Sequence, residues 1–126
     1  MKKKIMLLLG MSMIFSVGAA HAGEPMQMWN CGMEDGVTEA DVTENAKAWL
    51  EAARKVDGGE NIEIAILWPV VVNASGETDF IFLARLPTFA EWGRFWDAYP
   101  TSAVSENEND MTFCPDSVLW EFTGIE

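Results

Sequence analysis

Short apolar segments bounded by turn-forming residues predict four β-strands. Most of them alternate apolar and polar side chains, as half-buried strands do, and they span residues 26–31, 61–72, 80–86 and 117–123. Pro69 has no N–H to donate to a neighbouring strand, so the second strand is expected to be an edge strand or to carry a bulge. The polar segment 73–79, NASGETD, predicts a turn that joins the second and third strands as an antiparallel hairpin.

Apolar residues at helical spacing predict a first helix after Thr38. Thr38 and Asp41 resemble the N-cap and third position of a capping box, and Gly58-Gly59 supplies a stop at the C-terminal end. The predicted inner face of this helix carries Val42, Ala46, Trp49, Leu50 and Ala53. This spacing is typical of a helix that buries one face against a sheet.

A second helix is predicted within residues 87–100, PTFAEWGRFWDAYP. Thr88 and Glu91 form a capping box at its start, and Pro100 ends it. One face carries an aromatic stripe of Phe89, Trp92, Trp96 and Tyr99, with Phe95 beside it. We interpret this stripe as the inner face of a helix packed on the sheet, rather than as an aromatic ligand site. The polar, acidic segment 101–112 is expected to be a loop before the last strand.

Gly93 lies in the middle of the second predicted helix. A glycine there costs about 1 kcal/mol relative to alanine, so it needs a structural reason. Close approach of the helix to a neighbour, such as Trp120 or a second subunit, would supply one. The sequence therefore predicts that Gly93→Ala destabilises the fold.

The first 22 residues have the three-part pattern of a secretory signal peptide. Lys2, Lys3 and Lys4 precede an uncharged apolar run over residues 5–20, and Ala20-His21-Ala22 fits a small-x-small cleavage site. A run of this length is shorter than the roughly 20 residues that a membrane-spanning helix needs. We therefore expect cleavage after Ala22, export to the periplasm or the medium, no membrane anchor afterwards, and a single α+β domain over residues 23–126.

Removing the signal peptide changes the charge and the available chemistry. The mature chain of 104 residues keeps 5 of the 8 basic residues against 20 acidic ones, a net charge of −15. So few Lys and Arg side chains argue against a nucleic-acid partner, since phosphate binding draws on these groups. The one histidine, His21, leaves with the signal peptide. This excludes Ser-His-Asp and Cys-His catalysis and the zinc sites that use histidine.

The element order is β-α-β-β-α-β, the split βαβ arrangement. It predicts an antiparallel four-stranded sheet with two helices on one face, in which the first and last strands are neighbours. Cys31 and Cys114 are the only cysteines, and an even count in an exported chain predicts a disulfide. Two buried free thiols are the alternative. The neighbouring strands would bring both cysteines to the same end of the sheet, which agrees with the disulfide.

With this order and the aromatic second helix FAEWGRFWDAY, residues 26–124 resemble the dimeric α/β-barrel (ferredoxin-like) superfamily. That group includes cofactor-free antibiotic-biosynthesis-type monooxygenases and stress-responsive A/B-barrel proteins. The resemblance implies a homodimer that pairs sheet to sheet, encloses a cavity in each subunit and needs no cofactor. Many of the enzymes use histidine, which the mature chain lacks, so no catalytic residue is carried over.

Alternation also predicts which side chains share each face of the sheet. The helix-covered face is expected to carry Ile62, Ile64, Ile66, Phe80, Phe82, Val118, Trp120 and Phe122. The open face is expected to carry Glu63, Ala65, Leu67, Ile81, Leu83, Arg85, Leu119 and Glu121.

Arg85 is the one basic group on the predicted open face, and a guanidinium can grip a carboxylate with two hydrogen bonds. The candidate ligand-binding residues are Arg85, Glu63, Glu121, Leu67 and Leu83. In one interpretation Arg85 orients an anionic or polar ligand. In the other it only forms an ion pair with Glu63 or Glu121.

Two metal hypotheses are weaker. Met26 and Met28 point the same way on a strand, with Trp29 and Met33 nearby, and thioethers suit Cu(I). Methionines that fill gaps in a core are the alternative. Glu106, Glu108 and Asp110 alternate in an acidic loop, but the spacing lacks the glycine and the final glutamate of an EF-hand, so a solvated loop is favoured.

Three function classes follow. The first is an exported α/β barrel that binds or transforms a small organic molecule, the second is a non-catalytic interaction or structural module, and the third is a Cu(I) carrier.

Overall fold

The computed structural model describes residues 23–71, 78–106 and 110–125. The predicted signal peptide and most of the predicted turn over 73–79 lie outside these residues. The elements, in chain order, are β1 (Glu24–Met33), α1 (Glu39–Ala53), β2 (Glu63–Leu67), β3 (Phe80–Arg85), α2 (Phe89–Ala98), a 3-10 turn (Tyr99–Thr101), α3 (Ala103–Glu106) and β4 (Thr112–Phe122).

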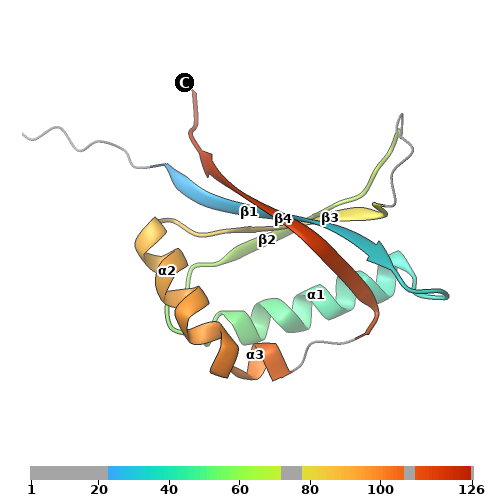
Figure 1. Cartoon of the computed structure of the whole chain (residues 1–126), viewed down its shortest axis with the longest axis horizontal. Helices are drawn as coiled ribbons and strands as arrows, with labels where there is room; N and C mark the ends of the chain where they lie inside the picture. The colour runs from blue at the N-terminus through green and yellow to red at the C-terminus, as the bar shows by residue number, and fades with distance from the viewer. Residues whose placement is uncertain (1–22, 72–77, 107–109, 126) are drawn as a thin grey trace, which may run out of the picture.

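The four strands form one antiparallel sheet in the order β2-β3-β1-β4. The helices lie together on one side of this sheet, and the other side carries no described element (Figure 1). This is the predicted α+β, ferredoxin-like arrangement, with β1 and β4 as neighbours and β2 at an edge. The second strand is shorter than expected. It ends at Leu67, two residues before Pro69, because proline cannot continue a ladder.

Capping interactions start both long helices where the sequence places them. The hydroxyl of Thr38 accepts a hydrogen bond from the Asp41 N–H at 3.2 Å, and Asp41 Oδ2 accepts one from the Thr38 N–H at 2.9 Å. Thr88 Oγ likewise accepts the N–H of Glu91 at 3.1 Å. These contacts satisfy N–H groups that a first helical turn leaves without partners.

The core between the helices and the sheet is centred on Phe95, which flanks the predicted aromatic stripe. Phe95 is 0% exposed, whereas Phe89 at the start of the stripe is 41% exposed. The other three stripe residues, Trp92, Trp96 and Tyr99, are partly buried and pack against this core. Gly58 allows this packing, because its φ is 82° and a β-carbon there would lie 2.5 Å from the Glu91 carbonyl oxygen.

The expected close contact at Gly93 is not found. Apart from its chain neighbours and the backbone of its own helix, no atom of the described chain lies within 4 Å of the position that a β-carbon at Gly93 would take. Trp120, the proposed neighbour, lies on the opposite face of the sheet, as the strand register below shows. The prediction that Trp120 explains this glycine is therefore wrong.

A bulge in β4 reverses the predicted side-chain alternation of that strand. The predicted disulfide is present and joins Cys31 to Cys114 with a Cα–Cα distance of 4.2 Å. On one side of it Gly32 pairs with Phe113, and on the other Asn30 pairs with Asp116. Cys114 and Pro115 therefore stand together opposite Cys31. Proline suits this irregular position because it has no N–H to pair.

The bulge corrects the assignment of the last strand to the two faces. Paired residues on antiparallel strands point to the same side. Trp120 pairs with Met26 and Val118 with Met28, whereas Leu119 pairs with Gln27. The residues Val118, Trp120 and Phe122 consequently lie on the open face, and Leu119 and Glu121 lie on the helix side, the reverse of the prediction.

The polar segment before β4 contains an element that the sequence analysis expected to be loop. It folds in part as α3, and Val104 within it is 1% exposed. Among the described helices, none is both long enough and apolar enough to cross a membrane.

A candidate ligand-binding cavity between the sheet and the helices

Arg85, the centre of the predicted site, is held by two carboxylates on the open face. Its Nη2 lies 2.5 Å from Glu63 Oε2, and its Nη1 lies 3.4 Å from Glu24 Oε2. The hydrogen bond that Arg85 donates to the Glu63 carboxylate is the main cause that raises the pKa of Arg85. The guanidinium also lies 5.5 Å from the centre of the Phe122 ring, a cation–π distance. The predicted strand began at residue 26, so Glu24 was missed as a partner.

Glu121 does not take part in this cluster. It lies on the helix side of the sheet, where its Oε1 accepts the backbone N–H of Gly23 at 3.0 Å. The prediction that Glu121 shares a face with Arg85 is therefore wrong. Leu67 and Leu83 do share the face of Arg85, since Leu83 pairs with Ala65 and Leu67 with Ile81 in the ladder that also pairs Glu63 with Arg85.

Little space surrounds the Arg85 cluster. A pocket of about 50 Å³ is lined by Glu24, Asn61, Glu63, Arg85, Leu86 and Pro87. A volume of this size suits one or two water molecules, since each occupies roughly 30 Å³ in the liquid. The guanidinium of Arg85 already forms ion pairs with Glu24 and Glu63. Ligand binding by Arg85, Glu63, Leu67 and Leu83 stays a prediction.

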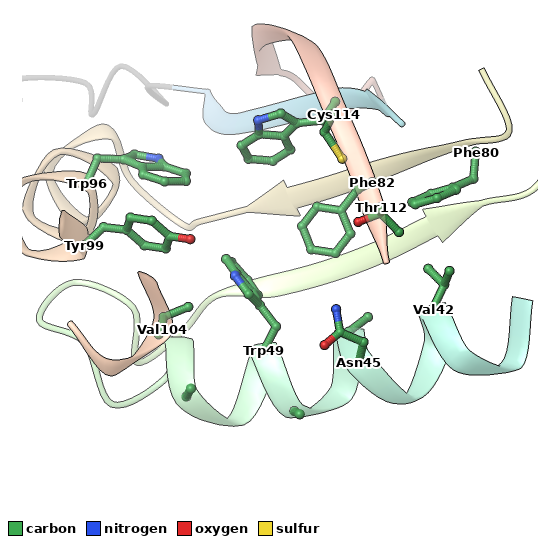
Figure 2. A pocket seen from close by; sticks show the side chains of 14 residues that line it. Val42, Asn45, Trp49, Phe80, Phe82, Trp96, Tyr99, Val104, Thr112 and Cys114 are labelled. Carbon is green, nitrogen blue, oxygen red and sulfur yellow. The ribbon is translucent and has the colours of Figure 1, made fainter. Parts of the chain in front are cut away.

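A far larger cavity lies on the other side of the sheet, between β1, β3, β4 and the helices. Its volume is about 700 Å³, and Figure 2 shows the side chains that surround it. The lining residues are Trp29, Val42, Asn45, Ala46, Ala48, Trp49, Ala52, Phe80, Phe82, Trp96, Tyr99, Val104, Thr112 and Cys114.

Aromatic rings from five elements form the wall of this cavity: β1, α1, β3, α2 and the 3-10 turn that follows α2. Trp29 of β1 lies 5.9 Å from Trp96 of α2 and 5.7 Å from Phe82 of β3, measured between ring centres. Trp96 in turn lies 4.9 Å from Tyr99, and Trp49 of α1 meets Phe82 edge-on at 5.4 Å. Figure 2 shows Trp49 reaching up from α1, with Trp96 of α2 and Tyr99 of the following 3-10 turn reaching in from the side. The rings brace one another in tilted and edge-to-face pairs, which favours fixed positions.

Part of the cavity wall follows from the sequence pattern of the two predicted helices. Val42 and Trp49 lie on the predicted inner face of α1, and Trp96 and Tyr99 lie on the predicted stripe of α2. The bulge in β4 then turns Thr112 and Cys114 toward the helices, so that this strand closes one side.

The cavity offers apolar surface with a few polar groups. Asn45, Thr112 and the Tyr99 hydroxyl are its uncharged polar side chains, and its lining contains no Asp, Glu, Lys, Arg or His. Cys114 is bound in the disulfide, so Tyr99 is the one lining residue with an ionisable side chain. This composition is suited to binding an organic molecule and poorly suited to acid–base or nucleophilic chemistry.

The sequence analysis missed this cavity because the same aromatic residues also fit a filled core. Trp49, Trp96 and Tyr99 are only partly buried and pack at the edge of the core formed by Phe95 and its neighbours. Periodicity identifies the inner face of a helix but does not reveal whether the space beneath it is filled. The one available signal was the number of tryptophans on inner-facing positions of both helices.

The metal hypotheses find no further support in the described residues. Met26 and Met28 both lie on the open face, where they pair with Arg85 and Leu83. Cys31 is part of the disulfide and so offers no thiolate. Within the ranges that the structure describes, no three His, Cys, Asp or Glu side chains are grouped to hold an ion. Glu108 and the side chain of Glu106, from the acidic-loop hypothesis, fall outside the described atoms.

No protein-family model and no curated protein sequence matches the chain. Solved structures do resemble it. A candidate chlorite dismutase matches 79% of this chain with a TM-score of 0.50 at 10% identity, and this chain spans 44% of that one, less than half its length. A hypothetical Arabidopsis thaliana protein matches 83% of this chain, and 92% of its own, with a TM-score of 0.51 at 13% identity.

A third structure, a dimeric ferredoxin-like protein of unknown function from Thermobifida fusca, has a TM-score of 0.47 at 19% identity, over 79% of this chain and 91% of its own. At such identities the first two likenesses show the fold alone. They agree with the ferredoxin-like topology read from the strand order.

Proposed function

We propose that this chain is an exported, homodimeric protein that binds a small, flat, apolar organic molecule in the cavity between its sheet and its helices. The observation that carries the proposal is the aromatic cavity itself. Its volume of about 700 Å³ falls within the range of roughly 300–1,000 Å³ of small-molecule sites. Rings from Trp29, Trp49 and Trp96 give a planar ligand surfaces on which to stack.

The charge of the protein favours a neutral or cationic ligand over an anionic one. The mature chain would carry a net charge of −15, which repels anions. The lining contains no basic side chain that could offset the repulsion. A cation could gain from the faces of the tryptophan rings, but no lining carboxylate is present to neutralise it. A neutral molecule best suits a negatively charged protein whose cavity lining carries no charged side chain.

Dimerisation through the open face completes the proposal. Trp120 on this face is 53% exposed, and Val118 and Phe122 on the same strand and Leu67 at the other edge of the sheet are exposed as well. A large apolar surface of this kind marks an interface in a soluble protein. A second copy of the chain would cover it, as the resemblance to dimeric α/β barrels implies. The ligand cavity lies on the other side of the sheet and would stay accessible.

Export is supported by the signal-peptide pattern and by the disulfide. Disulfides persist in oxidising compartments and are rare in the cytosol. The Cys31–Cys114 bond joins β1 to β4 at the cavity wall, so the proposed site needs an oxidising environment to keep its shape.

A matched pair of fluorescent probes tests the ligand class. N-phenyl-1-naphthylamine is neutral, and 8-anilino-1-naphthalenesulfonate has the same ring skeleton with an added sulfonate. We expect the neutral probe to bind at least ten times more tightly. Equal affinities, or preference for the sulfonate, would contradict the proposed selectivity.

A variant that fills the cavity locates the binding site. Ala48 lines the cavity from an exposed position on α1, so Ala48→Trp should reduce affinity for the neutral probe at least tenfold. Ala40 is exposed on the first turn of the same helix and is not part of the lining. Ala40→Trp is therefore the control and should leave affinity unchanged. Equal effects of the two variants would place the probe elsewhere.

A further inference from the structure

The first described residue, Gly23, lies against the carboxylate of Glu121. Its backbone N–H donates a hydrogen bond to Glu121 Oε1 at 3.0 Å. Gly23 is buried, and a β-carbon at this position would overlap the side chain of Glu121. A larger residue at this position would therefore require the Glu121 side chain to move from its place over this nitrogen atom.

The predicted cleavage site makes this nitrogen the start of the mature chain. A signal peptidase would hydrolyse the peptide bond between Ala22 and Gly23. Water adds OH to the carbonyl carbon of Ala22 and a proton to the nitrogen of Gly23, and the new amine takes up a second proton from solution. The neutral amide N–H beside Glu121 would thereby become an ammonium group, since α-amino groups have a pKa near 7.7–8.0.

We propose that signal-peptide removal creates an ion pair between the α-ammonium group of Gly23 and Glu121, which fastens the start of β1 to the end of β4. The inference rests on the export part of the proposed function. Hydrogen bonds between charged groups are roughly twice as strong as neutral ones. Removal of the signal peptide would therefore strengthen the contact between Gly23 and Glu121, which in the unprocessed chain is a hydrogen bond from a neutral amide.

The position of the pair explains why it matters to this fold. Strand β4 lies at the edge of the sheet and is exposed along nearly its whole length. The Cys31–Cys114 disulfide fastens it at one end, and Glu121 lies near the other. Glu24, the nearest acidic neighbour in sequence, is engaged with Arg85 on the opposite face and does not compete for the ammonium group.

The test compares the oxidised chain that starts at Gly23 with the same protein acetylated on its α-amine. All of the described strands and helices lie between Glu24 and Phe122, so the chain that starts at Gly23 contains every one of them. Acylation at about pH 6.5 favours the α-amine over lysine side chains, which are more basic. We expect acetylation to lower the Tm by roughly 3 °C or more, a shift that a domain of this size shows for a modest loss of stability.

Two variants at exposed positions of β4 separate the ion pair from general effects of charge. Glu121→Gln should lower the Tm of the free-amine protein and abolish the effect of acetylation. Asp116→Asn removes the same charge from the same strand and should leave the effect of acetylation intact. No change on acetylation, or an equal change in the Glu121→Gln protein, would overturn the ion pair.

The processing step is checked separately by determining the first residue of the protein recovered from a secreting host. A start at Gly23 supports the inference. A different first residue would overturn the processing step whatever the thermal data show, and a start at Gly23 without an effect of acetylation would overturn the ion pair alone.

Discussion

Trp120 lies opposite Met26 in the register of β1 and β4, on the sheet face turned away from the helices. The bulge at Pro115 sets this position, because without the extra residue Trp120 would point toward the helices. The same bulge turns Thr112 and Cys114 toward the helix side, where they close the cavity. One irregularity in the last strand thus forms both the proposed subunit interface and one wall of the proposed ligand site.

The first prediction concerns this interface. Trp120→Asp places a charge within the exposed apolar surface of β4 and should convert the proposed dimer into a folded monomer. Burying an unpaired carboxylate against the apolar face of a second subunit would cost several kcal/mol. Sedimentation equilibrium measures the change in mass. Val70→Asp is the control, since Val70 is 94% exposed beyond the end of β2. A Trp120→Asp protein that remains dimeric would place the interface elsewhere.

Much of the fold could be predicted because its signals are local. The caps at Thr38 and Thr88 depend on residues three positions away, and strand order follows from the order of elements. The disulfide follows from the cysteine count once β1 and β4 are neighbours. These features need no knowledge of side-chain packing.

The orientation of side chains on β4 and the cavity could not be predicted, because they depend on features that are not local in the sequence. Alternation gives the right faces for β2 and β3, but a single bulge reverses it in β4, and Pro115 was the only visible sign of one. The cavity depends on how the helices pack over the sheet, where Phe95 of α2 lies in the core and Gly58 lies against α2. Neither residue carries a sequence signal for this packing.

A second prediction concerns Gly93. No described atom lies near its missing side chain, so Gly93→Ala should raise the free energy of unfolding by about 0.5–1 kcal/mol, the gain in helix propensity. Urea unfolding measures it. Gly58→Ala is the contrasting variant and should destabilise, because Gly58 has a φ of 82° and touches α2. A loss of stability in Gly93→Ala would instead indicate that a second subunit approaches this helix.

A third prediction uses the pKa of Glu91. Hydrogen bonds from Asn61 and then from Thr88 hold the pKa of Glu91 below its usual value of 4.5. Because the folded-state pKa is lowered, the stabilisation is fully present above the unfolded value and is lost as pH falls through the folded value. Glu91→Gln should therefore lower stability at pH 6 more than at pH 2.5.

Urea unfolding at both pH values measures this difference, with Glu51→Gln on the exposed side of α1 as the control. A loss of stability in Glu91→Gln that is the same at pH 6 and pH 2.5 would mean that the carboxylate charge contributes nothing to the cap.

A fourth prediction separates the two candidate sites. Arg85→Ala removes the ion pairs with Glu63 and Glu24, whose side chains are exposed enough that we expect a loss of about 1 kcal/mol or less. Affinity for the neutral naphthylamine probe should not change, because the cavity lies on the other side of the sheet. A tenfold loss of affinity would restore Arg85 as a ligand-binding residue.

The most direct test of the proposed function follows the tryptophan indole N–H signals by NMR during titration with N-phenyl-1-naphthylamine. Three of the six tryptophans, Trp29, Trp49 and Trp96, line the cavity, and Trp120 lies on the opposite face of the sheet. The account predicts saturable shifts of the three cavity signals while the Trp120 signal stays in place. Movement of Trp120 with the three cavity signals unchanged would contradict it and place the ligand on the open face.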